Sequence, residues 1–286
     1  MNILYITDLD GTILGKDGWL MESTKDKLKQ LLDKGVPITY ATARSYTSAH
    51  ERLKEIPFRL PALTYNGCFL VDGGSGVVQQ TEQFEKKALT NVIAIFSRYY
   101  ICPLSYAMIE GKEKTSCYLE KSTKQVKKYM ISKPHDARNR FVLSEESLYE
   151  GEIFYFTLID TYSKLEPVYR DLLSYAEQYE KMYGQAPYQL TFQEEIYDPG
   201  DYWLEIMPAT AGKAEGVRRL KKVLGCDKVV CFGDGKNDIE MFLAAEEGFA
   251  VENACEELKM IATGIIQSNT DNGVINYIWN NEKSKT

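Results

Sequence analysis

Short apolar segments alternate with helical patterns at both ends of the chain. Segments 3–7 and 36–41 flank leucines at helical spacing, in a stretch that Ser23 or Thr24 is expected to cap. Near the C-terminus, a helical pattern is followed by the continuous apolar run 229–232. Such alternation is typical of a parallel sheet covered by helices. The sequence therefore predicts an α/β fold with a Rossmann-like parallel sheet to which both ends of the chain contribute.

The middle of the chain has a different pattern. Helical stretches alternate there with strand-like runs such as 153–158, in which alternate side chains beginning with Phe154 are expected to face covering helices. We therefore expect an inserted α+β domain at 83–196, within a parallel-sheet core formed by 1–82 and 197–286.

Composition narrows the class of protein. A chain of 286 residues suits one or two domains, and 44% hydrophobic with 26% charged residues is typical of a folded globular protein. With 41 acidic against 34 basic residues, the net charge of −7 argues against nucleic acid or an anionic membrane as partner. No run approaches the ~20 apolar residues of a membrane span, and the opening lacks a basic signal region. We expect a cytoplasmic protein.

Cysteine and histidine offer little chemistry. The six cysteines include no C-x-x-C pair, so we expect reduced thiols that serve packing. His50 and His135 are the only histidines, which leaves too few for a histidine-rich metal site or relay. Chemistry is therefore expected to depend on carboxylates.

Polar residues cluster directly after three of the predicted strands. Open parallel sheets place their ligand crevice at the carboxyl ends of the strands, so these clusters should converge on one edge. Each has an ordinary alternative when taken alone, as a turn, a helix cap or an acid in the first turn of a helix. Their convergence favours a site. The clusters are Asp8 with Asp10, Thr42 with Arg44, and Asp234 with Asn237 and Asp238.

The residue types in these clusters predict a phosphate site with a metal ion. The carboxylates of Asp8 and Asp234 would repel each other unless a cation lies between them, and oxygen ligands suit Mg²⁺. Lys213, the Thr42 hydroxyl and loop N–H groups are suited to the remaining phosphate oxygens. Asp8 and Asp10 lie two positions apart at a strand end, so both side chains can face one side. One carboxyl group can then attack while the other moves a proton.

These residues match a known family in order and spacing. Segment 8–12 (DLDGT), Thr42, Lys213 and segment 233–238 (GDGKND) resemble the four motifs of haloacid dehalogenase (HAD) superfamily phosphatases. Further segments resemble its Cof-like type IIB subgroup, in which a large α/β cap is inserted after the third strand. These segments are 65–67, 208–213, 250–254 and 271–274.

The resemblance implies a role for each matched residue. Asp8 would be the nucleophile that forms an aspartyl-phosphate, and Asp10 the acid/base that protonates the leaving oxygen and then activates water. Mg²⁺ would be held by Asp8, the backbone carbonyl of Asp10, and Asp234, with Asp238 as a further ligand or an orienting partner.

The remaining matched residues would bind phosphate or substrate. Thr42, Lys213 and Asn237 would hold phosphate oxygens, helped by the backbone N–H groups of Leu9 and Ala43. Arg44 has two open interpretations, because it could contact the substrate or brace its loop.

The sequence thus predicts a Mg²⁺-dependent phosphatase acting on a small phosphorylated metabolite. Sugar phosphates are the first expectation, followed by phosphorylated vitamins such as pyridoxal phosphate or flavin mononucleotide. A cap that closes over a small molecule and excludes water motivates the size limit. A phosphotransferase or phosphomutase that uses the same aspartyl-phosphate is one alternative, and a phospho-ligand sensor with little turnover is another.

Overall fold

The computed structural model describes residues 2–195 and 199–284. The chain forms two compact units, one of Met1–Thr81 with Ala211–Thr286 and one of Glu82–Thr210. The predicted boundary at 196 and 197 lies outside the described residues. The second unit continues beyond it to Thr210.

The first unit is built on a five-stranded sheet in which all pairs of neighbouring strands are parallel. Its order is β14-β13-β12-β1-β2, so the chain begins at an interior strand whose five residues are all buried. The predicted α/β class with a parallel core is confirmed. The strands are β1 (Ile3–Thr7), β2 (Ile38–Tyr40), β12 (Lys228–Gly233), β13 (Glu247–Val251) and β14 (Gly264–Ile266).

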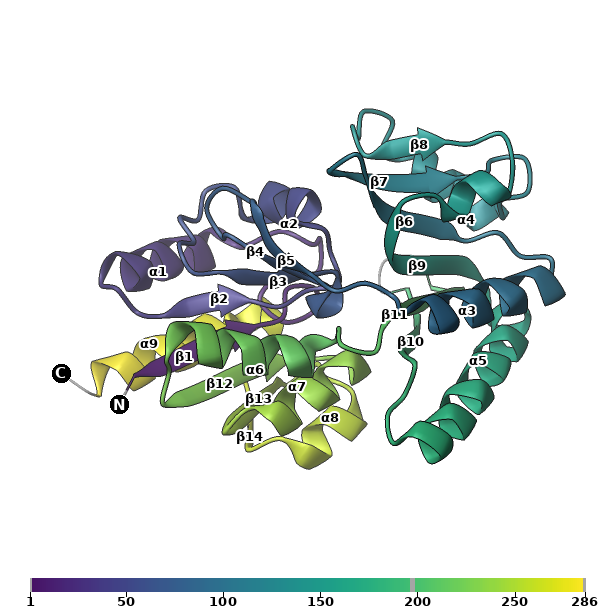
Figure 1. Ribbon diagram of the computed structural model, residues 1–286. Helices are drawn as coiled ribbons and strands as arrows, with labels where there is room; N and C mark the ends of the chain where they lie inside the picture. Colours follow the sequence, from purple (N-terminus) through teal and green to yellow (C-terminus); the bar gives the residue numbers. More distant parts are fainter. Residues whose placement is uncertain (1, 196–198, 285–286) are drawn as a thin grey trace. The chain divides into compact units, whose positions relative to one another are not determined.

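Helices cover both faces of this sheet (Figure 1). Figure 1 shows α6, α7 and α8 together in front of the sheet, while α9 lies behind it and packs against α1. A small antiparallel sheet precedes the insertion, with strands β3 (Ala62–Thr64), β4 (Phe69–Val71) and β5 (Val78–Thr81). The helices are α1 (Glu22–Asp33), α2 (Tyr46–Leu53), α6 (Lys213–Leu224), α7 (Ile239–Ala244), α8 (Glu256–Ile261) and α9 (Gly273–Lys283). Single 3₁₀ turns are η1 (Tyr65–Gly67), η3 (Lys236–Asp238) and η4 (Asn269–Asp271).

The start of α1 differs from the prediction. The helix begins at Glu22 after Met21, and neither Ser23 nor Thr24 caps it. Both hydroxyls instead donate to the Asn272 side-chain oxygen, at the residue just before α9. The expected cap was wrong because a tertiary partner takes both hydroxyl groups.

The second unit contains a six-stranded mixed sheet of order β10-β11-β9-β6-β7-β8. All its pairs are antiparallel except β7 with β8. The strands are β6 (Leu104–Ile109), β7 (Lys112–Cys117), β8 (Asn139–Phe141), β9 (Glu152–Thr161), β10 (Tyr188–Glu194) and β11 (Asp201–Pro208). Its helices are α3 (Lys86–Arg98), α4 (Lys124–Ile131) and α5 (Tyr162–Tyr183), with the 3₁₀ turn η2 (Glu146–Tyr149).

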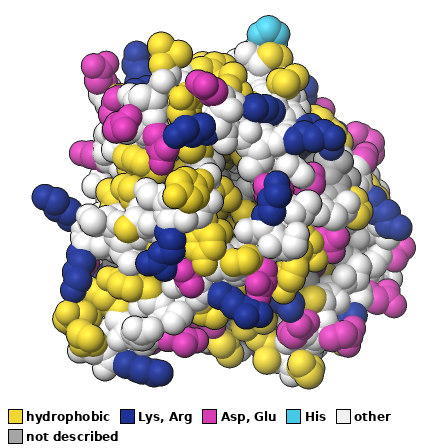
Figure 2. Space-filling view, turned by 90° about the vertical axis from the view of Figure 1, so that its right-hand side faces the viewer, with side chains coloured by type: hydrophobic (Ala, Val, Ile, Leu, Met, Phe, Trp, Pro, Cys, Tyr) yellow, Lys and Arg dark blue, Asp and Glu magenta, His cyan; other side chains and the backbone are white. Residues whose placement is uncertain are grey.

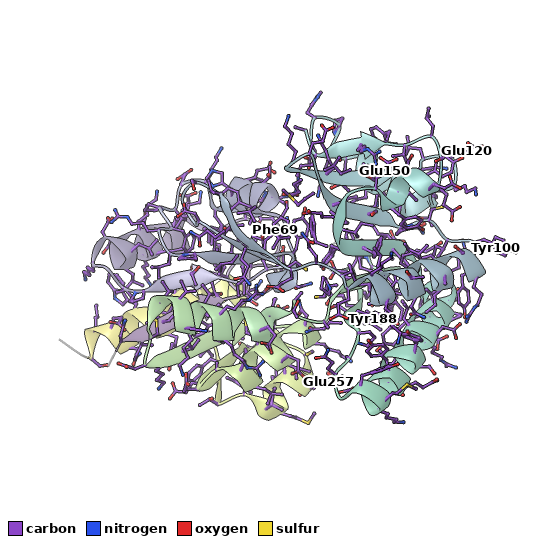
Figure 3. The ribbon with its side chains drawn as sticks, viewed as in Figure 1. Phe69, Tyr100, Glu120, Glu150, Tyr188 and Glu257 are labelled. Carbon is purple, nitrogen blue, oxygen red and sulfur yellow. The ribbon has the colours of Figure 1, made fainter. Side chains whose placement is uncertain are left out.

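Helices α3 and α5 pack together and bury one apolar core with the sheet of the second unit. Tyr188, labelled in Figure 3, reaches this core, and its hydroxyl donates to the Leu172 carbonyl at 2.9 Å. A register shift between β6 and β9 brings Ile153 rather than Phe154 into this core. The predicted alternation therefore applies from Phe156 onward and is wrong at Phe154.

Charged side chains of both signs are interspersed on the face shown in Figure 2, with hydrophobic side chains gathered in bands between them. Tyr100, in the turn after α3, is 94% exposed and points outward (Figure 3). No helix in the described part of the chain has the length and apolar character of a membrane span.

One close backbone approach in the first unit predicts a large stability effect. A Cβ atom on Gly67, whose φ is +88°, would lie 2.5 Å from the Gly212 carbonyl oxygen. Gly67→Ala is therefore expected to lower the free energy of unfolding by ~3 kcal/mol or more, measured by denaturant titration. Gly35→Ala is the matched control, since Gly35 has φ +78° with nothing within 4 Å of its Cβ position. It should lose ~1–2 kcal/mol, and an equal loss in both variants would contradict the prediction.

Candidate active site

The candidate site lies where three neighbouring strands end. Thr7, the last residue of β1, pairs with Tyr40 on one side and with Phe232 on the other. The Asp8 N–H donates to the Phe232 carbonyl at 2.9 Å, which continues the alignment by one residue. The strand ends are therefore level, and the residues that follow them lie at one edge of the sheet.

A buried lysine joins two of the predicted aspartates. Lys213, the first residue of α6, donates through Nζ to Asp8 Oδ1 at 2.5 Å and to Asp238 Oδ1 at 2.6 Å. The three side chains are 1%, 8% and 0% exposed, respectively. Asp238 Oδ2 accepts the N–H groups of Asp234 and Gly235, both at 3.0 Å. Asp238 thus fixes both the lysine and the loop after β12.

Residues without a predicted individual role hold Asp234 in place. Its Oδ1 accepts the Thr12 hydroxyl at 3.0 Å. Gly11 leaves room for the carboxyl group, because a Cβ there would lie 2.2 Å from Asp234 Oδ2. Asn253 Nδ2 donates to the Gly11 carbonyl at 2.8 Å. Thr12 and Asn253 both lie in segments that carried the family resemblance. That resemblance was the sequence signal from which their role near Asp234 could have been predicted.

The acidic side chains form a group suited to a cation. One carboxylate oxygen from each of Asp8, Asp234 and Asp238 lies within 4.8 Å of the others, and no second group of this kind occurs in residues 2–195 and 199–284. Three carboxyl groups face the single ammonium of Lys213, and oxygen donors are the ligands that hard divalent cations prefer. These residues therefore fit a divalent metal ion.

The electrostatics of the group agree with this reading. Burial raises the pKa of Asp8 to about 7, which Lys213 opposes and Asp238 reinforces. Burial, with the charges of Asp8 and Asp238, raises the pKa of Asp234 well above its usual range. Burial alone would lower the pKa of Lys213, but the two carboxylates raise it above the ordinary lysine value. The Lys213 ammonium therefore stays charged. This one positive charge compensates only part of the negative charge that the three carboxyl groups can carry.

The Asp10 carboxyl group lies outside this acidic group. It forms a two-point ion pair with Arg44, with 2.6 Å from Nε to Oδ2 and 2.6 Å from Nη2 to Oδ1. Arg44 Nη1 also donates to the Ser48 hydroxyl at 3.0 Å. The structure thus places Arg44 against Asp10, with each side chain about one-fifth exposed.

The other predicted phosphate ligands lie on the loops at this edge. Thr42 is buried, and its hydroxyl accepts the Arg44 N–H at 3.2 Å. The Leu9 carbonyl accepts three N–H groups of the turn that follows it. Ala43 and Asn237 are half-buried. Their roles toward phosphate remain predictions.

The sequence predicts no catalytic role for the histidines and cysteines, although the Cys231 thiol lies close enough to Lys213 and Asp238 for their charges to act on it. His50 on α2 and His135 in a loop are exposed. Five cysteines are buried and Cys255 is half-buried, and all six are free thiols. Burial raises the pKa of the Cys102 thiol to about 11, which is unfavourable for a nucleophile.

Comparison with known proteins identifies the family. The family model described as haloacid dehalogenase-like hydrolase matches residues 5–278. The chain belongs to this family. The resemblance seen in the motifs is confirmed, and so is the expectation of a hydrolase.

Relatives of this haloacid dehalogenase-like hydrolase match it from end to end. It is 25% identical over 289 residues to 5-amino-6-(5-phospho-D-ribitylamino)uracil phosphatase YwtE of Bacillus subtilis, covering 95% of each chain. SMU.1108c from Streptococcus mutans has the same fold, with a TM-score of 0.75, 20% identity and 99% of both chains covered. The HAD subclass IIB sugar phosphatase BT4131 gives a TM-score of 0.72 at 19% identity, also over 99% of both chains. The predicted class, a phosphoric monoester hydrolase of the Cof-like type, agrees with these relatives.

Removing the buried lysine is expected to destabilise the protein. Lys213→Met leaves Asp8 and Asp238 buried without their shared cation, which should cost ~3–5 kcal/mol of unfolding free energy at neutral pH. Denaturant titration followed by circular dichroism measures this. Lys236→Met is the control. Lys236 pairs with Glu257 at the surface, where the two side chains are 64% and 47% exposed, so the change should leave stability unchanged. Equal midpoints for the two variants would refute the buried pairing.

Proposed function

We propose that the protein is a Mg²⁺-dependent phosphatase that hydrolyses small phosphorylated metabolites, with sugar phosphates first among them. The observation that carries this proposal is the buried Asp8–Lys213–Asp238 contact beside Asp234, at the carboxyl ends of the strands. Family membership and the phosphatase relatives support the reaction class. A sugar phosphatase among the proteins of similar fold supports the substrate class.

Asp8 acts as the nucleophile in the proposed mechanism. Lys213 holds its Oδ1 and carries positive charge at the place where the phosphoryl group transfers. An oxygen of Asp8 bonds to phosphorus as the bond to the leaving group breaks, and Asp10 supplies the proton that the leaving oxygen takes up. Asp10 then accepts a proton from the water that releases phosphate from Asp8.

Mg²⁺ would be held by Asp8, Asp234 and the backbone carbonyl of Asp10. When bound, it supplies positive charge that offsets the charge of the transferring phosphoryl group. Asp238 engages Lys213 with one carboxylate oxygen and two loop N–H groups with the other, which favours an orienting role over direct ligation.

Phosphate oxygens would be bound by side chains and N–H groups on the loops. Thr42 and Asn237 contribute polar side chains, and Leu9 and Ala43 contribute backbone N–H groups. We further propose that the inserted unit selects the substrate, because a covering domain limits substrate size and excludes water.

The central prediction concerns turnover. Release of inorganic phosphate is measured across a panel of sugar phosphates, pyridoxal phosphate and flavin mononucleotide, with Mg²⁺ and after chelation. We expect Mg²⁺-dependent release, and at least a ~10³-fold loss for Asp8→Asn because the nucleophile is gone. Asp33→Asn, an exposed change at the end of α1, is the matched control and should keep full activity.

Two results would contradict this function. One is the absence of phosphate release from every monoester, as expected of a sensor, and the other is an unchanged rate after chelation. Recovery of labelled phosphate on an added sugar acceptor, rather than in solution, would instead identify a phosphotransferase.

Metal binding has its own readout that does not depend on turnover. Saturating Mg²⁺ should raise the Tm, since a ligand of the folded state stabilises by ~2.7 kcal/mol at 100 times its Kd. Asp234→Asn should abolish this shift and Asp33→Asn should keep it, as followed by differential scanning fluorimetry. A shift that persists in Asp234→Asn would place the cation elsewhere.

A further inference from the structure

The Arg44–Asp10 pair is a second charged contact at the catalytic edge, distinct from the buried lysine. We infer that Arg44 is a positioning residue that fixes the Asp10 carboxylate in one orientation, outside the Asp8–Asp234–Asp238 group, from which it serves proton transfer. This inference rests on the proposed phosphatase function and deepens it.

The geometry of the pair fixes both carboxylate oxygens. Nε and Nη2 of Arg44 each lie 2.6 Å from a different oxygen of Asp10, the two-point arrangement that a planar guanidinium offers. A single-point contact would leave the carboxyl group free to rotate. The fork therefore determines the Asp10 side-chain orientation as well as its charge environment.

Arg44 is itself anchored at several points. Its N–H donates to the Thr42 hydroxyl, and its carbonyl accepts the Tyr65 N–H at 2.9 Å. Its Nη1 donates to Ser48, in the first turn of α2, where the Ser48 N–H is capped by Ser45. The guanidinium plane is thus set by the β2–α2 connection, independently of the β1 end that carries Asp10.

This anchoring separates two carboxyl groups with different tasks. Asp10 lies close enough to Asp8 for its charge to act on that residue, yet its oxygens are turned to Arg44. A carboxylate that joined the cation-binding group would no longer be available to move protons. Arg44 keeps the Asp10 carboxylate from joining the cation-binding group. Nε, Nη1 and Nη2 of Arg44 all donate to protein partners, which argues against a role for Arg44 as a substrate ligand.

Mispositioning Asp10 has different consequences for the two chemical steps. In the first step the P–O bond to the leaving group breaks as the Asp8–phosphorus bond forms, and the Asp10 proton goes to the leaving oxygen. A 4-nitrophenolate leaves as a stable anion and does not need that proton, whereas an alkoxide does. In the second step water attacks phosphorus, the Asp8–phosphorus bond breaks, and Asp10 takes the proton of the water whichever substrate was used.

The test is Arg44→Ala in rapid-mixing kinetics with 4-nitrophenyl phosphate and with an alkyl phosphate such as a hexose 6-phosphate. With the first substrate we expect a burst of about one nitrophenolate per enzyme, then a steady state at least ~30-fold slower than wild type. Acid-quenched protein should carry one phosphoryl group on Asp8 by intact mass and peptide mapping. With the alkyl phosphate the first turnover itself should slow, without phosphoenzyme accumulating.

Three further variants sharpen the result. Arg44→Lys keeps the charge but loses the fork, so it should resemble Arg44→Ala. Ser48→Ala removes one anchor and should show a weaker form of the same pattern, which also covers the case in which Arg44→Ala does not fold. Lys29→Ala, at a surface ion pair with Glu55, should behave as wild type.

Several outcomes would overturn the inference. Equal slowing of both substrates without phosphoenzyme would indicate a merely structural role, and a raised KM with unchanged kcat would indicate a substrate ligand. Wild-type behaviour of Arg44→Lys would show that charge suffices without the fork. A wild-type enzyme inactive on both substrates would remove the proposed function and the inference with it, whereas an active wild type with any of these variant results removes the inference alone.

Discussion

The proposed catalytic edge depends on one buried ammonium group. Lys213 lies between Asp8 and Asp238, and its side chain is 1% exposed. Taking a charge out of water is unfavourable unless good partners compensate for it, so the three side chains require one another. Through them the start of α6, the end of β1 and the loop after β12 are connected. The site is therefore a structural junction of the first unit as well as its proposed chemical centre.

The position of this junction could be predicted from the sequence. Asp8, Thr42 and Asp234 each follow a short apolar strand, and parallel strands in register bring their carboxyl ends to one edge. The observed pairing of Thr7 with both Tyr40 and Phe232 is this register. The local sequence pattern identifies the strands and shows that they run parallel. This information was sufficient to predict that these residues lie at one edge.

Side-chain partners across the chain could not be predicted in the same way. The Thr12–Asp234 and Arg44–Asp10 contacts join residues 222 and 34 positions apart, and their orientations depend on packing that spacing does not encode. The same limit explains why Ser23 and Thr24 bind Asn272 instead of capping α1. It also explains the shifted register near Phe154, which depends on how β6 pairs with β9.

The approach of Gly67 to Gly212 has a consequence for the architecture. Gly67 lies before the inserted unit and Gly212 directly after it, and their backbones meet with no side chain between them. Arg219 Nη2 reinforces this contact by donating to the Gly67 carbonyl at 2.6 Å. The two segments of the first unit that flank the insertion are thus held together within that unit. A host domain held together in this way tolerates exchange of the inserted domain. Evolution can thus replace the inserted unit with another of different length while the host, with its proposed catalytic edge, is inherited unchanged.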